Sequence, residues 1–94
     1  MMPASETPEA RLKRMGMRSW RRGTKEMDLV LGPWSDVHLS ALPEDRLALY
    51  DALLAENDQD LMLWVFGQAA APAPYQALIA EIAGYARTRL TPNI

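Results

Sequence analysis

Apolar residues recur along this sequence at the spacing of one face of an α-helix, and they do so in five segments separated by proline, glycine or asparagine. Residues three and four positions apart lie on the same side of a helix, so each segment can bury one stripe. No segment shows the alternation of a half-buried strand next to a hairpin turn. At 94 residues the chain has room for one domain. We therefore predict an all-α protein: a compact five-helix single domain over residues 8–90, after a disordered lead of residues 1–7 and before a tail of residues 91–94.

Residues with known preferences for helix ends set the expected boundaries. Thr7 can cap a first helix whose first turn holds Pro8, and Asn57 or Asp58 can cap a fourth helix that ends near Gly67. The segment 69–74 contains two prolines and is predicted to be a linker. The predicted helices span residues 8–20, Gly23 or Thr24 to His38, 43–56, 57–67 and 75–89.

The apolar stripes predict which side chains form the core. In the first helix Leu12 and Met15 face inward, with Met17 and Trp20 as further candidates. The second helix presents the longest stripe, with Met27, Val30, Leu31 and Trp34 followed by Val37 and His38.

Charge is unevenly distributed along the chain. Residues 1–26 carry seven Lys or Arg and three Glu, whereas residues 27–60 carry eight Asp or Glu and one Arg. A surface with this polarity can orient a charged partner. The alternative is that the basic and acidic segments pair with each other inside the fold.

The residues needed for catalysis or metal binding are nearly absent. The chain has no cysteine, which excludes disulfides and thiolate metal sites, and it has one histidine. His38 falls on or beside the apolar face of the second helix, so we interpret it as a structural residue rather than a catalytic base. The acidic segment 56–60 lacks the glycine and glutamate of a calcium loop and is better explained by helix capping. We therefore expect a protein that is not an enzyme, with no catalytic residue, no metal site and no cofactor-binding residue.

The sequence also bears on location. No apolar run approaches the ~18 residues that cross a bilayer, and the N-terminus lacks the apolar region of a secretory signal. Glu6 and Glu9 argue against a mitochondrial presequence. We expect a cytoplasmic protein with no membrane partner; a mitochondrial matrix protein whose presequence has been removed is the alternative.

The segment RSWRRGTKEMD, residues 18–28, joins the first two predicted helices. If Gly23 is the N-cap of the second helix, then Glu26 is its third residue and can complete half of a capping box. This structural interpretation accounts for Gly23 and Glu26. It leaves Arg21 and Arg22 unexplained, because adjacent cations beside the positive end of a helix are mildly destabilising. Both arginines are therefore candidates for binding an anionic group.

A nucleic-acid ligand is one alternative for this basic segment. Seven cations and a tryptophan lie within residues 11–25, and such a set suits phosphate contacts and base stacking. The chain is nevertheless acidic overall, with a net charge of -2, and contains no basic recognition helix.

Two sequence landmarks are similar to those of a known family. Residues 22–26 read R-G-T-K-E and match the R-G-x-x-E motif that follows a basic, aromatic-containing helix, and residues 58–64 match an acidic turn followed by D-L-x-x-W. In length, helix layout and spacing the chain resembles the small succinate dehydrogenase assembly factors of bacteria and mitochondria from about residue 10 to residue 87. Met27, where leucine is usual, and Thr24, where a larger residue is common, are small departures.

The resemblance implies a five-helix assembly factor. Members of that family bind the flavoprotein subunit of succinate dehydrogenase, often also that of fumarate reductase, and promote covalent attachment of FAD to it. FAD then belongs to the partner, and whether this chain contacts it directly is left open. We expect a monomer that binds no nucleic acid, although the sequence does not fix the oligomeric state. The partner-binding residues that it indicates are Arg18, Arg21, Arg22, Gly23, Glu26 and Asp28.

On this reading Arg21 and Arg22 meet acidic or carbonyl groups of the flavoprotein, and Gly23 lets its backbone approach closely. Removal of the Arg22 side chain would then leave the fold largely intact. The alternative functions are a small nucleic-acid-binding helical protein and an antitoxin-like interaction module.

Overall fold

The computed structural model describes residues 6–90, and over these residues all of the regular secondary structure is helical. The predicted all-α class with five α-helices is confirmed. The termini 1–5 and 91–94, which include most of the predicted lead and the whole tail, lie outside the described residues. The elements are α1 (Pro8–Trp20), α2 (Lys25–His38), the 3-10 helix η1 (Leu39–Ala41), α3 (Glu44–Leu53), α4 (Asp58–Val65), the 3-10 helix η2 (Ala73–Tyr75) and α5 (Gln76–Leu90).

Side-chain caps explain where three of these helices begin. Thr7 accepts a hydrogen bond from the Ala10 amide at 3.0 Å, and Asn57 accepts one from the Asp60 amide at 2.9 Å. Both caps are as predicted. The cap of α2 is Thr24, whose hydroxyl accepts from the Met27 amide at 3.2 Å.

Glycine ends α4, also as predicted. Gly67 has a φ of +77°, a left-handed conformation that glycine adopts without strain. The amides of Gly67 and Gln68 bond back to the carbonyls of Trp64 at 3.3 Å and Leu63 at 2.8 Å, which satisfies two carbonyls of the last turn.

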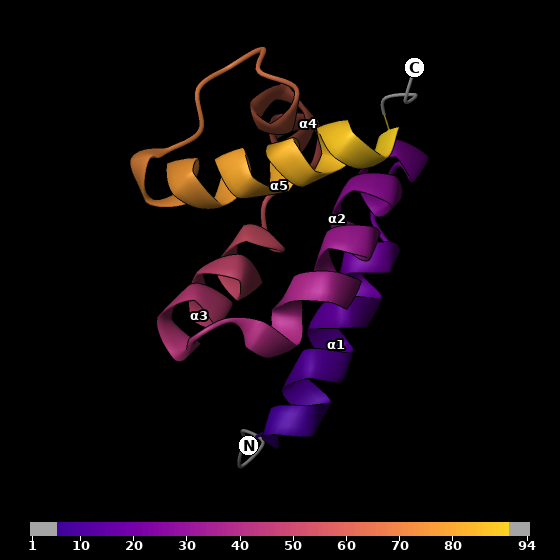
Figure 1. Ribbon diagram of the computed structural model, residues 1–94, viewed down its shortest axis with the longest axis vertical. Helices are drawn as coiled ribbons and strands as arrows, with labels where there is room; N and C mark the ends of the chain where they lie inside the picture. The colour runs from indigo at the N-terminus through magenta and orange to yellow at the C-terminus, as the bar shows by residue number, and fades with distance from the viewer. Residues whose placement is uncertain (1–5, 91–94) are drawn as a thin grey trace.

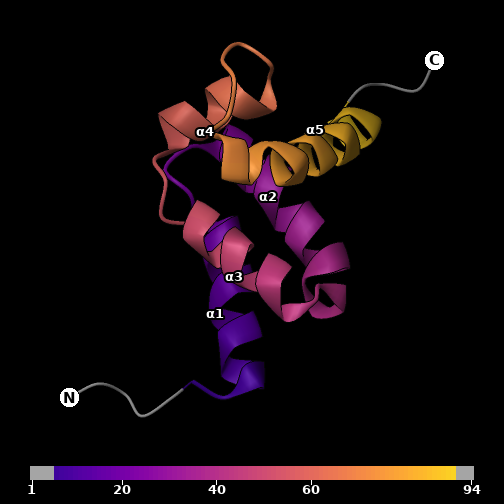
Figure 2. The same ribbon diagram turned by 90° about the vertical axis from the view of Figure 1, so that its left-hand side faces the viewer.

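Four of the five described α-helices form two pairs, and α3 belongs to neither (Figure 1). The first, α1 and α2, run side by side in opposite directions, and α4 and α5 lie together near the end where α1 passes into α2. Figure 2 shows α4 next to the loop between α1 and α2, with α5 extending away from that loop. The loop after α3 is thereby brought beside the loop after α1.

The core lies where these helices meet. The rings of Trp34 and Tyr50 lie 5.0 Å apart, and the Tyr50 hydroxyl lies 2.6 Å from that of Ser19, which donates in turn to the Met15 carbonyl. Burial raises the pKa of Tyr50, so this hydroxyl stays protonated. The largest fully buried side chains are Trp34, Tyr50, Met15, Met27, Leu31, Leu53, Leu54, Leu61, Leu78, Ile82 and Val30.

Three residues predicted to face inward are exposed instead. Met17, Trp20 and Val37 are 45%, 40% and 56% exposed. The ring of Trp20 lies against Gly32, where a Cβ atom would come within 2.3 Å of it, and its Nε1 donates to Asp36 at 3.1 Å. Trp20 therefore packs across the outer side of α2 rather than into the core.

His38 is half-buried and belongs to the packing of α2 against α5. Its ring stacks on Trp34 with centroids 4.8 Å apart and meets the Tyr85 ring edge-on at 5.2 Å. This arrangement agrees with the structural interpretation of His38.

Candidate functional site

The Arg22 side chain joins the loop after α1 to the turn between α3 and α4. Its Nε donates to Asp58 Oδ1 at 2.7 Å, while Nη1 and Nη2 donate to the carbonyls of Leu54 and Glu56, each at 2.8 Å. The side chain is only 8% exposed. The expectation that Arg22 lacks a structural explanation is wrong, because its guanidinium is directed into the protein.

Gly23 lies against the same carboxylate. Its amide donates to Asp58 Oδ2, and a Cβ atom at this position would come within 2.6 Å of that oxygen. Among residues 6–90 only Gly67 has a positive φ, so backbone freedom is not what Gly23 supplies. Glycine is needed here because the space for a side chain is filled by Asp58.

Asp28 holds the other side of the loop. Its Oδ1 accepts from the Arg22 amide at 2.6 Å, and it lies in the first turn of α2, where a carboxylate is favoured by the helix dipole. The predicted cap at Gly23 and capping box with Glu26 are wrong. Thr24 caps α2 one residue later, because its hydroxyl reaches the Met27 amide, and Glu26 is therefore the second residue of the helix rather than the third.

The remaining predicted site residues lie on the outside of the loop. Arg21 and Glu26 are exposed, and no ion pair among residues 6–90 involves either side chain. Arg18 is exposed as well and makes one long hydrogen bond of 3.4 Å to the Leu54 carbonyl. The structure thus divides the six predicted residues: Arg22, Gly23 and Asp28 bond inward, whereas Arg18, Arg21 and Glu26 are accessible.

A shallow groove adjoins the accessible residues. It is lined by Arg14, Met17 and Arg18, which recur at helical spacing along one side of α1, and by Arg21, which follows the end of that helix. Met17 contributes exposed apolar surface to this groove. The groove therefore combines positive charge with an apolar contact.

Pairing between the basic and acidic segments accounts for part of the charge asymmetry. Arg14 lies 2.8 Å from Asp51 and 2.6 Å from Glu6, and Arg11 lies 2.8 Å from Glu44. Hydrogen bonds from Arg14 lower the pKa of both Asp51 and Glu6. With the Arg22–Asp58 pair, three arginines of residues 1–26 are bound to carboxylates of residues 44–58.

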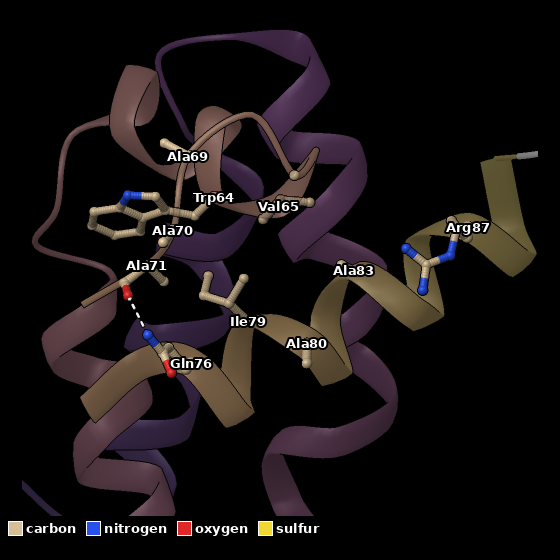
Figure 3. Close-up of a pocket in the computed structure, with 11 residues that line it drawn as sticks. Trp64, Val65, Ala69, Ala70, Ala71, Gln76, Ile79, Ala80, Ala83 and Arg87 are labelled. Atoms are coloured by element: carbon tan, nitrogen blue, oxygen red, sulfur yellow. Dashed lines mark hydrogen bonds between the residues drawn. The ribbon is translucent and has the colours of Figure 1, made fainter. Parts of the chain in front are cut away.

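A second hollow lies on α5, and no residue of the α1–α2 loop lines it (Figure 3). Mostly apolar side chains from α4, the following linker and α5 line it, among them the ring of Trp64, and Arg87 lies at one end. The Gln76 side chain crosses its edge to donate to the Ala71 carbonyl at 2.9 Å. The lining includes no carboxylate or imidazole, so it offers no group for acid–base chemistry.

Sequence reasoning missed Asp58 as a member of this site. The acidic turn was identified as a landmark and as a helix cap, and Asn57 does cap α4. No local signal in the sequence points to this further role, because Asp58 and Arg22 are 36 positions apart.

Comparison with known proteins bears directly on this loop and the turn beside it. The model of the family described as "Flavinator of succinate dehydrogenase" matches residues 13–86, which include both landmarks. The chain belongs to this family. The predicted resemblance to the succinate dehydrogenase assembly factors is thereby confirmed.

Two curated relatives of this family are similar over most of the chain. Succinate dehydrogenase assembly factor 2, mitochondrial, of Schizosaccharomyces pombe is 33% identical over 86 residues, which cover 89% of this chain and 62% of that protein. The protein of the same name from Drosophila grimshawi is 32% identical over 90 residues, covering 86% of this chain and 61% of its own length. The chain thus spans less than two thirds of the length of these relatives. Among residues 6–90, no helix combines the length and apolar character required to cross a bilayer.

Proposed function

We propose that this protein is an assembly factor that binds the flavoprotein subunit of succinate dehydrogenase and promotes its covalent flavinylation with FAD. The observation that carries this proposal is the family match over residues 13–86, which contains the whole α1–α2 loop and the turn beside it. The names of the relatives specify assembly of succinate dehydrogenase. Fumarate reductase, a related flavoprotein, is a second candidate target.

The proposed role requires no catalytic group in this chain. A binding protein speeds a bond-forming step in its partner when it binds best to the partner conformation in which the reacting groups are aligned. The partner then supplies both FAD and the amino acid that bonds to it. We accordingly propose that the protein is not itself an enzyme.

The accessible residues around the loop are the proposed contact surface. Arg18 and Arg21 offer guanidinium groups to carboxylates or carbonyl oxygens of the flavoprotein, and Glu26 can accept hydrogen bonds. Met17 adds apolar area that contact with a partner would remove from water. Arg22, Gly23 and Asp28 contribute by shaping the loop from inside.

The nucleic-acid alternative loses its main argument. It depended on seven cations in residues 11–25, but Arg11, Arg14 and Arg22 are paired with carboxylates of the same chain. Fewer free cations mean fewer phosphate contacts and weaker binding.

We further propose that the protein acts as a monomer and that FAD stays with the flavoprotein. The cytoplasmic location remains a prediction, and the names of both relatives specify mitochondria.

A reconstitution with purified components tests the function. The apo flavoprotein subunit is incubated with FAD, with and without this protein, and covalent flavin is read from fluorescence in a denaturing gel. We expect a complex of the two proteins on size-exclusion chromatography and faster appearance of covalent flavin. A flavoprotein that neither binds this protein nor gains flavin faster in its presence would contradict the proposal.

A further inference from the structure

We infer that Asp58 is a positioning residue for partner binding: its carboxylate binds the Arg22 side chain and the Gly23 amide, and so holds the loop in the course that presents Arg21 and Glu26 outward together. This inference rests on the proposed function, because it assigns to Asp58 a role in forming the contact surface.

Both oxygens of Asp58 are used on consecutive residues of one loop. Oδ1 accepts from Arg22 Nε at 2.7 Å, and Oδ2 accepts from the Gly23 amide. The carboxylate is 15% exposed and belongs to the first residue of α4, directly after the Asn57 cap. The start of α4 is therefore a fixed support, and its dipole favours the negative charge of Asp58.

The loop is fixed from three directions. Asp28 of α2 binds the Arg22 amide, Asp58 of α4 binds the Gly23 amide, and the carbonyls of Leu54 and Glu56 bind the Arg22 guanidinium. Two successive backbone amides are thus held by carboxylates from two different helices. A loop restrained in this way presents its outer side chains with little loss of conformational entropy on binding.

Arg21 and Glu26 flank the restrained residues. Arg21 precedes Arg22 directly, and Glu26 lies in the first turn of α2. Their side chains are exposed, and none of the ion pairs described above involves them. Loss of the hydrogen bond between Gly23 and Asp58 would change the course of the backbone between Arg21 and Glu26. The distance between the Arg21 guanidinium and the Glu26 carboxylate, which we infer to face the same partner, would then change as well.

The absence of a side chain at residue 23 is part of the same arrangement. Because a Cβ there would come within 2.6 Å of Asp58 Oδ2, glycine and aspartate are sterically matched. This steric fit between Gly23 and Asp58 gives a physical reason why this chain has both the R-G motif and the acidic turn. It also predicts that substitutions at the two positions are not additive, since they share a contact.

The first test compares Asp58→Asn with Asp60→Asn, a control in the same helical turn whose side chain takes no part in the cluster. Affinity for the purified flavoprotein subunit is measured by calorimetry at a low temperature at which circular dichroism shows each variant to be folded. We expect Asp58→Asn to bind about tenfold more weakly, with a shifted Gly23 amide resonance in NMR spectra, and Asp60→Asn to bind like wild type.

The second test uses the steric match. Gly23→Ala is measured in the wild-type and Asp58→Ala backgrounds. We expect the alanine to weaken binding strongly when Asp58 is present and to have little further effect once that carboxylate is gone, because the obstructing oxygen has been removed.

The outcomes separate this inference from the function on which it rests. If wild type binds the flavoprotein and folded Asp58→Asn binds equally well, the positioning role is wrong and the proposed function stands. If Asp58→Asn does not fold at any temperature, or the two substitutions are additive, the positioning role is also wrong. If wild type does not bind at all, the function and the inference fail together.

Discussion

Replacement of Arg22 by alanine should remove a large part of this protein's free energy of unfolding. The substitution removes a largely buried ion pair with Asp58. It also leaves the Glu56 carbonyl without its donor and the Leu54 carbonyl with only the long bond from Arg18. Breaking a buried pair typically costs about 3–5 kcal/mol, and we take the lower end, ~3 kcal/mol, because Asp58 keeps its bond to the Gly23 amide. A domain of this size has a free energy of unfolding of roughly 5–14 kcal/mol. The loss should lower Tm by about 12–24 °C.

The adjacent arginine provides a matched control. Arg21 is exposed and unpaired among the described residues, so Arg21→Ala should change the free energy of unfolding by no more than about 0.5 kcal/mol. Urea and thermal unfolding of both variants, followed by circular dichroism, give the comparison. Equal stability of Arg22→Ala and Arg21→Ala would refute the assignment of Arg22 to the interior.

Two further predictions concern packing and pH. Gly32→Ala should destabilise the protein by about 1–3 kcal/mol and alter tryptophan fluorescence, because the new Cβ would lie 2.3 Å from the Trp20 ring. A Cβ atom at Gly16 would have no atom within 4 Å, so Gly16→Ala should stabilise α1 by roughly 0.5–1 kcal/mol. If urea unfolding showed Gly32→Ala to be the more stable of the two variants, the packing of Trp20 against Gly32 would be contradicted. Because Arg14 lowers the pKa of Asp51, the stabilisation from this pair is present above the ordinary carboxyl pKa of about 4 and is lost as the pH falls through the lower value in the folded protein. Unfolding measured from neutral pH into acid should therefore show a smaller loss of stability in Arg14→Gln than in wild type, and an equal loss would count against the pair.

Local sequence signals were sufficient for the helices. Thr7, Asn57 and Gly67 each satisfy a helix end through neighbours within five residues, and such interactions can be predicted without knowledge of the fold. The inward stripe of α2 was likewise predictable from Val30 and Leu31, because periodicity alone selects the buried face.

Interactions between distant segments were not predictable in this way. Arg22 and Asp58 are 36 positions apart, so nothing in the local sequence shows that one binds the other. Gly23 was therefore interpreted as a cap, although its role is to leave space for a carboxylate. The apolar stripe of the first helix made Trp20 a further candidate for the core, but its ring packs across Gly32 on the outer side of α2.

The sequence predicted the place of this loop between two helices more accurately than the orientation of its side chains. The loop at residues 18–28 was correctly located as the junction of the first two helices. Which of its residues face outward depends on where the α3–α4 turn lies, and that is a property of the tertiary structure. This is why Arg21 and Arg22, adjacent and chemically identical, have different environments.

The central claim is that the outward face of this loop binds a flavoprotein and thereby promotes attachment of its flavin. Covalent flavin in the succinate dehydrogenase flavoprotein subunit, measured by in-gel fluorescence in cells that lack their own assembly factor, tests it most directly. Cells supplied with wild type or with Arg87→Glu, an exposed charge reversal on α5, should contain flavinylated subunit. Cells supplied with the double variant Arg21→Glu and Glu26→Arg, produced as stable protein, should contain little. Equal covalent flavin with the double variant and with wild type would contradict the account.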